Sequence, residues 1–220
     1  MTGKLWLELT AKPEEFEKFI LSAMNKALSE TLKKSLKPIE NQFSELIYSA
    51  VYSCMEMEEL RSGTLRHELG LSSGQSARAS EEIARAVGGS VFLEIQGSKD
   101  KRAGGLSVNI QRTNFANVLS ISGSTVDYFS KRSKEIVTLE WLDWLLTKGD
   151  TIIVGKFHFE PRAGRGRTGG GRMEKGGSWR INSQFSGTVN DNFISRALNE
   201  KSVRTRMQGI IEKTIKKNWN

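Results

Sequence analysis

The spacing of apolar residues predicts a long helical region in the first third of the chain. Leucines alternate with other residues over Lys4–Leu9, which is typical of a short strand. A proline and two glutamates at Pro13–Glu15 favour the start of a helix. Apolar residues then recur every three or four positions, with an interruption at Pro38, which lacks a backbone donor. The pattern predicts two amphipathic helices, or one long kinked helix, over about residues 12–60.

The middle of the chain combines a helical pattern with alternating ones. Ala77–Val87 has apolar residues at helical spacing. Apolar residues alternate over Val91–Ile95 and again over Leu106–Ile110, which predicts a β-hairpin with a long charged loop at Gly97–Gly105. Val118–Ile121 is predicted to form another short strand.

The remaining pattern predicts one packed helix, one strand and C-terminal helices. Lys134–Leu146 has a wide apolar stripe and is predicted to be a buried helix. Thr151–Phe159 is apolar on both faces, which favours a central strand. Helical spacing returns after Asp191, in one or two helices with a basic tip. The order of elements predicts a single α+β domain over residues 1–220, with a small antiparallel sheet, a packed helix, long N-terminal helices and a C-terminal helix.

A basic, glycine-rich stretch separates the predicted strand from the C-terminal helices. Arg162–Arg180 contains seven glycines, six basic residues and one acid, a net charge of +5 in a chain of net charge +8. Glycine this dense disfavours a helix. We therefore expect a long mobile loop over about residues 161–178, with Ser178–Ile181 as the candidate returning strand. The stretch is interpreted as contacting nucleic-acid phosphates or a neighbouring subunit, or as a solvated loop only. The basic candidates for contact are Arg162, Arg165, Arg167, Arg172, Lys175 and Arg180.

Candidate chemistry is sparse in this sequence. The spacing Gly164-x-Gly166-x-x-Gly169 matches a dinucleotide-binding fingerprint, but the two glycines that follow oppose the helix start that this motif requires. His67 and His158 are the only histidines and Cys54 is the only cysteine. We therefore predict no metal, no cofactor and no enzymatic activity. Three tryptophans are interpreted as structural anchors: Trp141, Trp144 and Trp179.

Composition and charge narrow the class of protein. The chain has 220 residues, of which 37% are hydrophobic, enough for a real core. Its pI of about 9.6 favours contact with polyanions. No apolar run approaches the roughly 20 residues of a membrane span, and the first residues lack the apolar region of a signal peptide. We expect a soluble protein that is intracellular at synthesis and does not contact a membrane.

Two segments of the sequence carry a series of short motifs. The first segment is LRSGTLRHELGL, at residues 60–71. The second comprises LEWLDWLLTKGDTIIV, RTGGGRMEKGGSWRI and FSGTVNDNFISRAL, between residues 139 and 198. The order of these motifs resembles that of tail-completion or neck proteins of tailed bacteriophages. The resemblance implies a small α+β subunit of a ring between the head connector and the tail, without activity or cofactor. It also implies an assembly contact near Arg167, Thr168 and Gly169, which adds Thr168 to the candidates.

This resemblance implies a location and a set of partners. The expected location is the neck of the virion, and the expected partners are other copies of the chain, the head connector or adaptor, and the tail terminator or tail proteins. The positive charge suits a channel through which packaged DNA passes. The alternative is a stand-alone nucleic-acid-binding protein that uses its Arg/Gly-rich stretch.

Overall fold

Helices dominate the computed structural model, which describes residues 13–96, 105–110, 114–130, 134–162, 164 and 166–219. The predicted strand Lys4–Leu9 and the hairpin loop at residues 97–104 lie outside the described residues. In chain order, the elements are α1 (Pro13–Tyr52), α2 (Met55–Ser62), α3 (Leu65–Glu68), α4 (Ser73–Gly88), β1 (Phe92–Gln96), β2 (Gly105–Asn109), α5 (Ala116–Leu119), η1 (Ser122–Ser124), β3 (Val126–Ser130), β4 (Glu135–Leu139), α6 (Trp141–Thr147), β5 (Val154–Pro161), β6 (Gly171–Trp179), α7 (Phe193–Asn199) and α8 (Lys201–Asn218). The predicted α+β class is confirmed.

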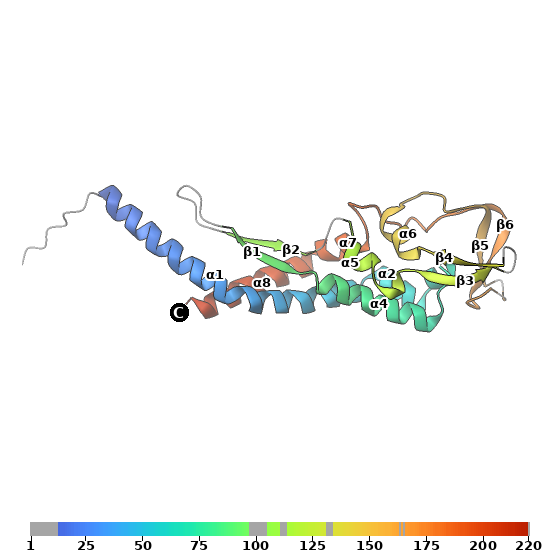
Figure 1. The fold of residues 1–220 in the computed structure, drawn as a ribbon, viewed down its shortest axis with the longest axis horizontal. Helices are drawn as coiled ribbons and strands as arrows, with labels where there is room; N and C mark the ends of the chain where they lie inside the picture. Colours follow the sequence, from blue (N-terminus) through green and yellow to red (C-terminus); the bar gives the residue numbers. More distant parts are fainter. Residues whose placement is uncertain are drawn as a thin grey trace, which may run out of the picture.

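The first helix is the longest described element. Its 40 residues correspond to a length of about 60 Å. Pro38 lies inside the helix, so of the two sequence predictions the single kinked helix is correct. Figure 1 shows that the axis of α1 bends where it passes the end of α8, as expected where a proline removes a helical hydrogen bond.

The core forms on the C-terminal half of α1. Ile39, Phe43, Ile47 and Val51 are completely buried there, beneath α4 and α8. Helix α4 approaches closely: a Cβ atom at Gly88 would lie 2.7 Å from the Ser44 carbonyl oxygen. Close packing on both sides of one helix is therefore the basis of the fold.

Helix α8 runs antiparallel to α1 and ends partway along it. Gln42 Nε2 lies 3.5 Å from Thr214 Oγ1, and Asn218 Nδ2 donates to Ser35 Oγ at 3.0 Å. Residues Pro13–Glu30, which we call the α1 overhang, extend beyond this end (Figure 1). None of the described side chains from Glu15 to Glu30 is buried.

An ion pair with one buried partner joins α2 to α7. The Glu56 side chain is 4% exposed, and its Oε1 accepts a hydrogen bond from Arg196 Nη2 at 2.6 Å. Arg196 also contacts Asp191, at 3.3 Å. The pair holds α2 against α7, and removing Arg196 would leave the buried Glu56 carboxylate without its ion-pair partner.

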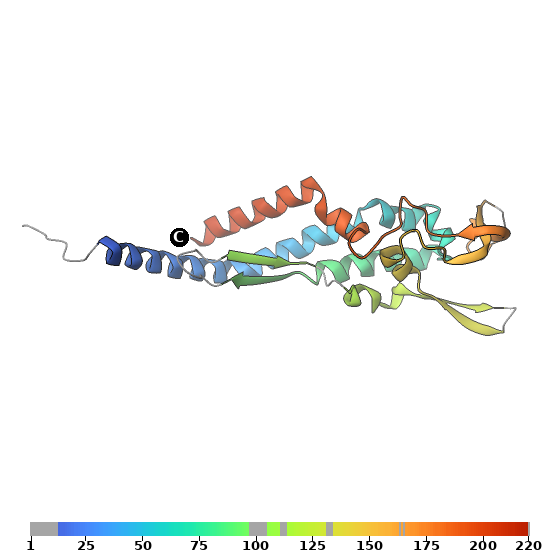
Figure 2. The same cartoon turned by 90° about the horizontal axis from the view of Figure 1, so that it is seen from above.

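The described strands form three separate antiparallel hairpins, not the single small sheet that we expected. β1 pairs with β2, β3 with β4, and β5 with β6. The predicted hairpin at residues 91–110 is confirmed, with Leu93 opposite Val108. Figure 2 shows the β3–β4 and β5–β6 hairpins diverging at the end of the molecule farthest from the α1 overhang.

Three predictions from the hydrophobic pattern are wrong. Residues 118–121 lie at the end of the short helix α5, not in a strand. The predicted helix Lys134–Leu146 is divided into β4 and α6, because Ile136, Val137 and Thr138 are β-branched and pair with β3. β5 is not a central strand, since β6 is its only described neighbour; its second apolar face covers the cavity described below.

Gly209 lies inside α8, where a glycine costs stability. A Cβ atom built there meets nothing within 4 Å. Gly209→Ala is therefore expected to raise the free energy of unfolding by about 0.5–1 kcal/mol, measured by urea denaturation. Gly187→Ala is the control: its Cβ would lie 2.6 Å from the Leu145 carbonyl oxygen, so this variant should be destabilised. A destabilised Gly209→Ala would contradict the assignment of free space beside α8.

Candidate interaction site

The second half of the glycine-rich stretch is a strand, so the long loop predicted over about residues 161–178 is wrong. β6 begins at Gly171 and pairs with β5 in a register that places Phe159 opposite Met173. The connecting turn is therefore limited to residues 162–170. Glycines disfavour a helix, but here they allow the two strands to pair closely. A Cβ atom at Gly171 would lie 2.3 Å from the Phe159 ring, and Gly176 has a φ of 108°, which favours glycine.

The turn is fastened to α3 by side chains predicted to contact a partner. Arg167 Nη2 donates to the Gly70 carbonyl oxygen at 2.7 Å, and its guanidinium lies 5.1 Å from the centre of the Tyr128 ring. Thr168 Oγ1 lies 2.8 Å from His67 Nδ1. The contacts with Gly70 and His67 join residues about 100 positions apart in the sequence, so Arg167 and Thr168 have an internal structural role.

The other predicted contact residues differ in their environment. Arg172 pairs with Glu174 at 2.6 Å on the same strand. Arg162, Lys175 and Arg180 are exposed, and their side chains make no hydrogen bond or ion pair with another described residue. Arg165 lies outside the described residues. Three cations of the predicted set are thus presented to solvent.

The three tryptophans lie at or near the base of the β5–β6 hairpin. Trp141 is completely buried and its indole N–H donates to the Gly123 carbonyl oxygen at 3.0 Å. Trp144 and Trp179 pack edge to face, with ring centres 6.0 Å apart. Trp179 is 6% exposed at the end of β6. Trp144 and Trp179 therefore contribute to the packing that holds the hairpin on the body, whereas Trp141 packs in the core beside η1.

A cavity of about 490 Å³ lies between the β3–β4 and β5–β6 hairpins, and we call it the hairpin cavity. Its walls come from α3, α6 and both hairpins. The large apolar side chains in its lining are Tyr128, Leu139, Trp144, Phe157, Phe159 and Met173. Arg167 and Arg172 also line it, so an apolar interior is combined with cationic groups. This combination suits an apolar ligand with a negative charge beside it.

Three polar groups of the cavity lining are affected by burial: the Trp179 indole, the Glu68 carboxyl and the His67 imidazole. The buried indole N–H of Trp179 makes no hydrogen bond of normal geometry to a described residue. It lies close enough to Glu68 to lower the pKa of that carboxyl, but burial has the larger, opposite effect, so the pKa of Glu68 is raised. Burial and the adjacent positive charge of Arg66 lower the pKa of His67. Burial thus shifts the pKa of both side chains in the direction that favours the neutral form.

The residues weighed for chemistry do not gather into a reactive site in the described part of the chain. Those residues contain no group of three or more His, Cys, Asp or Glu side chains that could hold a metal ion. His158 Nδ1 lies 2.9 Å from the Gly176 carbonyl oxygen. Burial raises the pKa of Cys54, between α1 and α2, to about 12. This thiol is therefore protonated at neutral pH and unreactive.

Sequence reasoning missed the part that α3 and Tyr128 take in this site. Residues 60–71 and the segment beginning at Arg167 belong to the motifs on which the resemblance rests, and these two segments touch in the structure. Their joint occurrence was the signal available in the sequence. Nothing in the spacing of residues indicates that Tyr128 lies beneath Arg167.

Comparisons of this chain with protein-family models, with curated proteins and with solved structures found no match. No helix among the described residues is both long enough and apolar enough to cross a membrane. The function is therefore argued from the surfaces and contacts of the molecule itself.

Glu68→Gln is expected to stabilise the protein at neutral pH. A carboxyl with a raised pKa in the folded state is destabilising when ionised, and this effect begins as the pH rises past the ordinary value of 4.5. The variant should therefore exceed the wild type in free energy of unfolding at pH 7, and the difference should vanish below pH 4.5. Urea denaturation at both pH values measures this. Glu212→Gln, at an exposed glutamate of α8, should show no such difference.

Arg167→Ser is expected to lower the free energy of unfolding by about 1 kcal/mol, because it removes the bond to Gly70 and the contact with Tyr128. Arg162→Ser is the matched control and should change it by less than about 0.5 kcal/mol, since this side chain is exposed. Thermal unfolding monitored by circular dichroism compares the two. Equal stability of both variants would show that the Arg167 contacts are not formed in solution.

Proposed function

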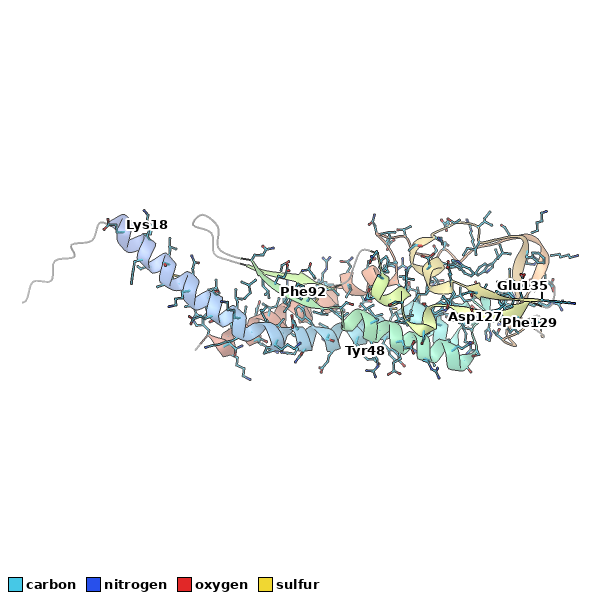
Figure 3. All side chains as sticks on the ribbon, viewed as in Figure 1. Lys18, Tyr48, Phe92, Asp127, Phe129 and Glu135 are labelled. Atoms are coloured by element: carbon cyan, nitrogen blue, oxygen red, sulfur yellow. The ribbon has the colours of Figure 1, made fainter. Side chains whose placement is uncertain are left out.

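We propose that this chain is a structural subunit of a closed homo-oligomeric ring in the neck of a tailed bacteriophage, between the head connector and the tail. The observation that carries the proposal is the presence of exposed apolar surfaces at opposite ends of an elongated subunit. Figure 3 shows this separation, with Lys18 labelled at one end and Phe129 and Glu135 at the other. A structural role of this kind requires no catalytic group, and we assign none.

One apolar surface lies on the β3–β4 hairpin. Phe129 and Ile136 are directly opposite each other across the two strands and are 63% and 72% exposed. Val126 and Leu139, on the other face of the hairpin, are turned towards the body and are much less exposed. A pair of large apolar side chains on the solvent face of a projecting hairpin is typical of a protein contact.

The second apolar surface lies on the α1 overhang. Phe19 is 73% exposed and Met24 is 58% exposed. A helix of about this length without a packed face is only marginally stable in water. The overhang therefore gains stability when its apolar stripe packs against another molecule.

Two different apolar surfaces on one subunit favour a head-to-tail arrangement of copies. Such heterologous contacts close into a ring when the rotation between neighbours permits. The resemblance to neck proteins supports the location, because its two motif segments meet in one structural unit through Arg167 and Gly70. The proposed partners are the head connector or adaptor on one side and the tail terminator or tail proteins on the other.

Exposed cations provide the proposed contact with packaged DNA. Arg162, Lys175 and Arg180 are exposed on or beside the β5–β6 hairpin. Their charges would attract phosphates without reading bases, which suits a channel through which DNA must move.

Electron cryo-microscopy of particles of the phage that encodes this chain tests the proposal. We expect a closed ring of identical copies around the DNA between head and tail. A single central copy in the neck, or absence from the particle, would refute it, as would enzymatic turnover abolished by one point substitution.

The exposed cations also favour the alternative function, a stand-alone nucleic-acid-binding protein. That function predicts tight binding of DNA or RNA by a monomer or dimer, with a strong dependence on salt. Replacing Arg162, Lys175 and Arg180 together with serine should then weaken binding and reduce the salt slope by about 2 to 3. The control replaces Lys213, Lys216 and Lys217 on α8 with serine, which removes the same number of positive charges. Weak binding by the wild type, unaffected by either triple variant, would exclude the alternative.

A further inference from the structure

We infer that the α1 overhang of one copy docks its apolar stripe in the hairpin cavity of a second copy. The inference deepens the ring part of the proposed function by naming the two surfaces that meet. It rests on the placement, shape and charge of these surfaces, whose apolar side chains are exposed or line an open cavity.

The overhang cannot fill its own cavity. α1 is one continuous helix from Pro13 to Tyr52, and it holds the overhang at the end of the molecule opposite to the hairpins (Figures 1 and 3). The overhang spans about 27 Å beyond the helical body. The overhang can therefore enter only the hairpin cavity of another molecule.

The apolar side chains of the overhang fit a groove of this kind. Phe19, Ile20 and Met24 are exposed, and Ala23 and Ala27 continue the same stripe at intervals of three and four residues. Amphipathic helices dock in apolar grooves through anchors at this spacing. The cavity of about 490 Å³ has aromatic walls that can receive such anchors.

Charge favours a second copy as the occupant. Residues 13–30 contain four glutamates and two lysines, a net charge of −2, although the whole chain carries +8. Residues 154–179, which form the β5–β6 hairpin, contain six basic and two acidic residues, a net charge of +4. Glu15 and Glu17 are exposed near the apolar anchors. Arg167 and Arg172 line the cavity and are exposed, although Arg167 also bonds to Gly70 and Arg172 pairs with Glu174. Opposite charges therefore accompany both apolar surfaces.

Complementation between two variants tests this interface. Phe19→Glu with Met24→Glu disables the overhang, and Met173→Glu disables the cavity. Each variant alone should associate about tenfold or more weakly than the wild type in sedimentation equilibrium, whereas an equimolar mixture should recover heterodimers, because one intact overhang meets one intact cavity. Phe92→Glu, on β1 at a side chain that is 52% exposed, is the control and should associate like the wild type.

Several outcomes would overturn the inference. It is wrong if the mixture gives no heterodimer, if either variant associates like the wild type, or if the wild type is monomeric up to about 100 μM, a concentration at which even weak interfaces form. Circular dichroism confirms folding of each variant, and Met173→Trp, which fills the cavity without adding a charge, replaces Met173→Glu if that variant unfolds. A ring seen in particles together with failed complementation would leave the proposed function intact and reject only these surfaces.

Covalent capture provides an independent test. Met24→Cys in one chain and Met173→Cys in the other should form a disulfide-linked dimer in a mixture under mild oxidation. Burial keeps the natural Cys54 thiol protonated, with a pKa of about 12, so it should not compete. Phe92→Cys mixed with Met173→Cys is the control pair. Equal cross-linking in both mixtures would overturn the inference.

Discussion

Burial of one face of α1 is the constraint on which the rest of the structure depends. Ile39, Phe43 and Ile47 are fully buried between α4 and α8. A two-stranded hairpin has little stability of its own, so each of the three hairpins depends on this helical body. The Glu56–Arg196 ion pair fixes the same body from another side, where α2 meets α7.

The same constraint explains why the functional surfaces lie so far apart. α8 covers α1 only as far as Ser35, so the first turns of α1 remain without a neighbour among the described elements. The β3–β4 and β5–β6 hairpins project from the opposite end of the body (Figure 2). A subunit built in this way presents the apolar α1 overhang at one end and the hairpin cavity at the other. Head-to-tail assembly requires two such different surfaces on each copy.

Long elements in which the apolar residues recur at one clear spacing could be predicted from the sequence, and short elements could not. Apolar spacing over many turns identified α1, and alternation on both sides of a charged loop identified the β1–β2 hairpin. Over residues 134–146 the apolar positions fit the spacing of a helix and also that of a strand. The β-branched residues there pair with β3, a strand that the hydrophobic pattern did not predict. The glycine-rich stretch was misjudged because glycine density excludes a helix but does not exclude strand pairing.

The candidate site was only partly predictable for a related reason. Its cations are visible in the sequence, but whether an arginine faces solvent or its own chain depends on contacts between distant residues. Arg167 meets a backbone carbonyl 97 positions away, whereas Arg162 in the same turn makes no such side-chain contact with a described residue.

The antiparallel return of α8 has a further consequence, for synthesis: Asn218 pairs with Ser35 across 183 positions, so a ribosome releases α1 long before the helix α8 that packs on it. The nascent chain therefore carries α1 without its α8 cover through most of translation, with α4 available to pack on it, and closure of the core is a late, long-range step that is slow and open to capture by chaperones.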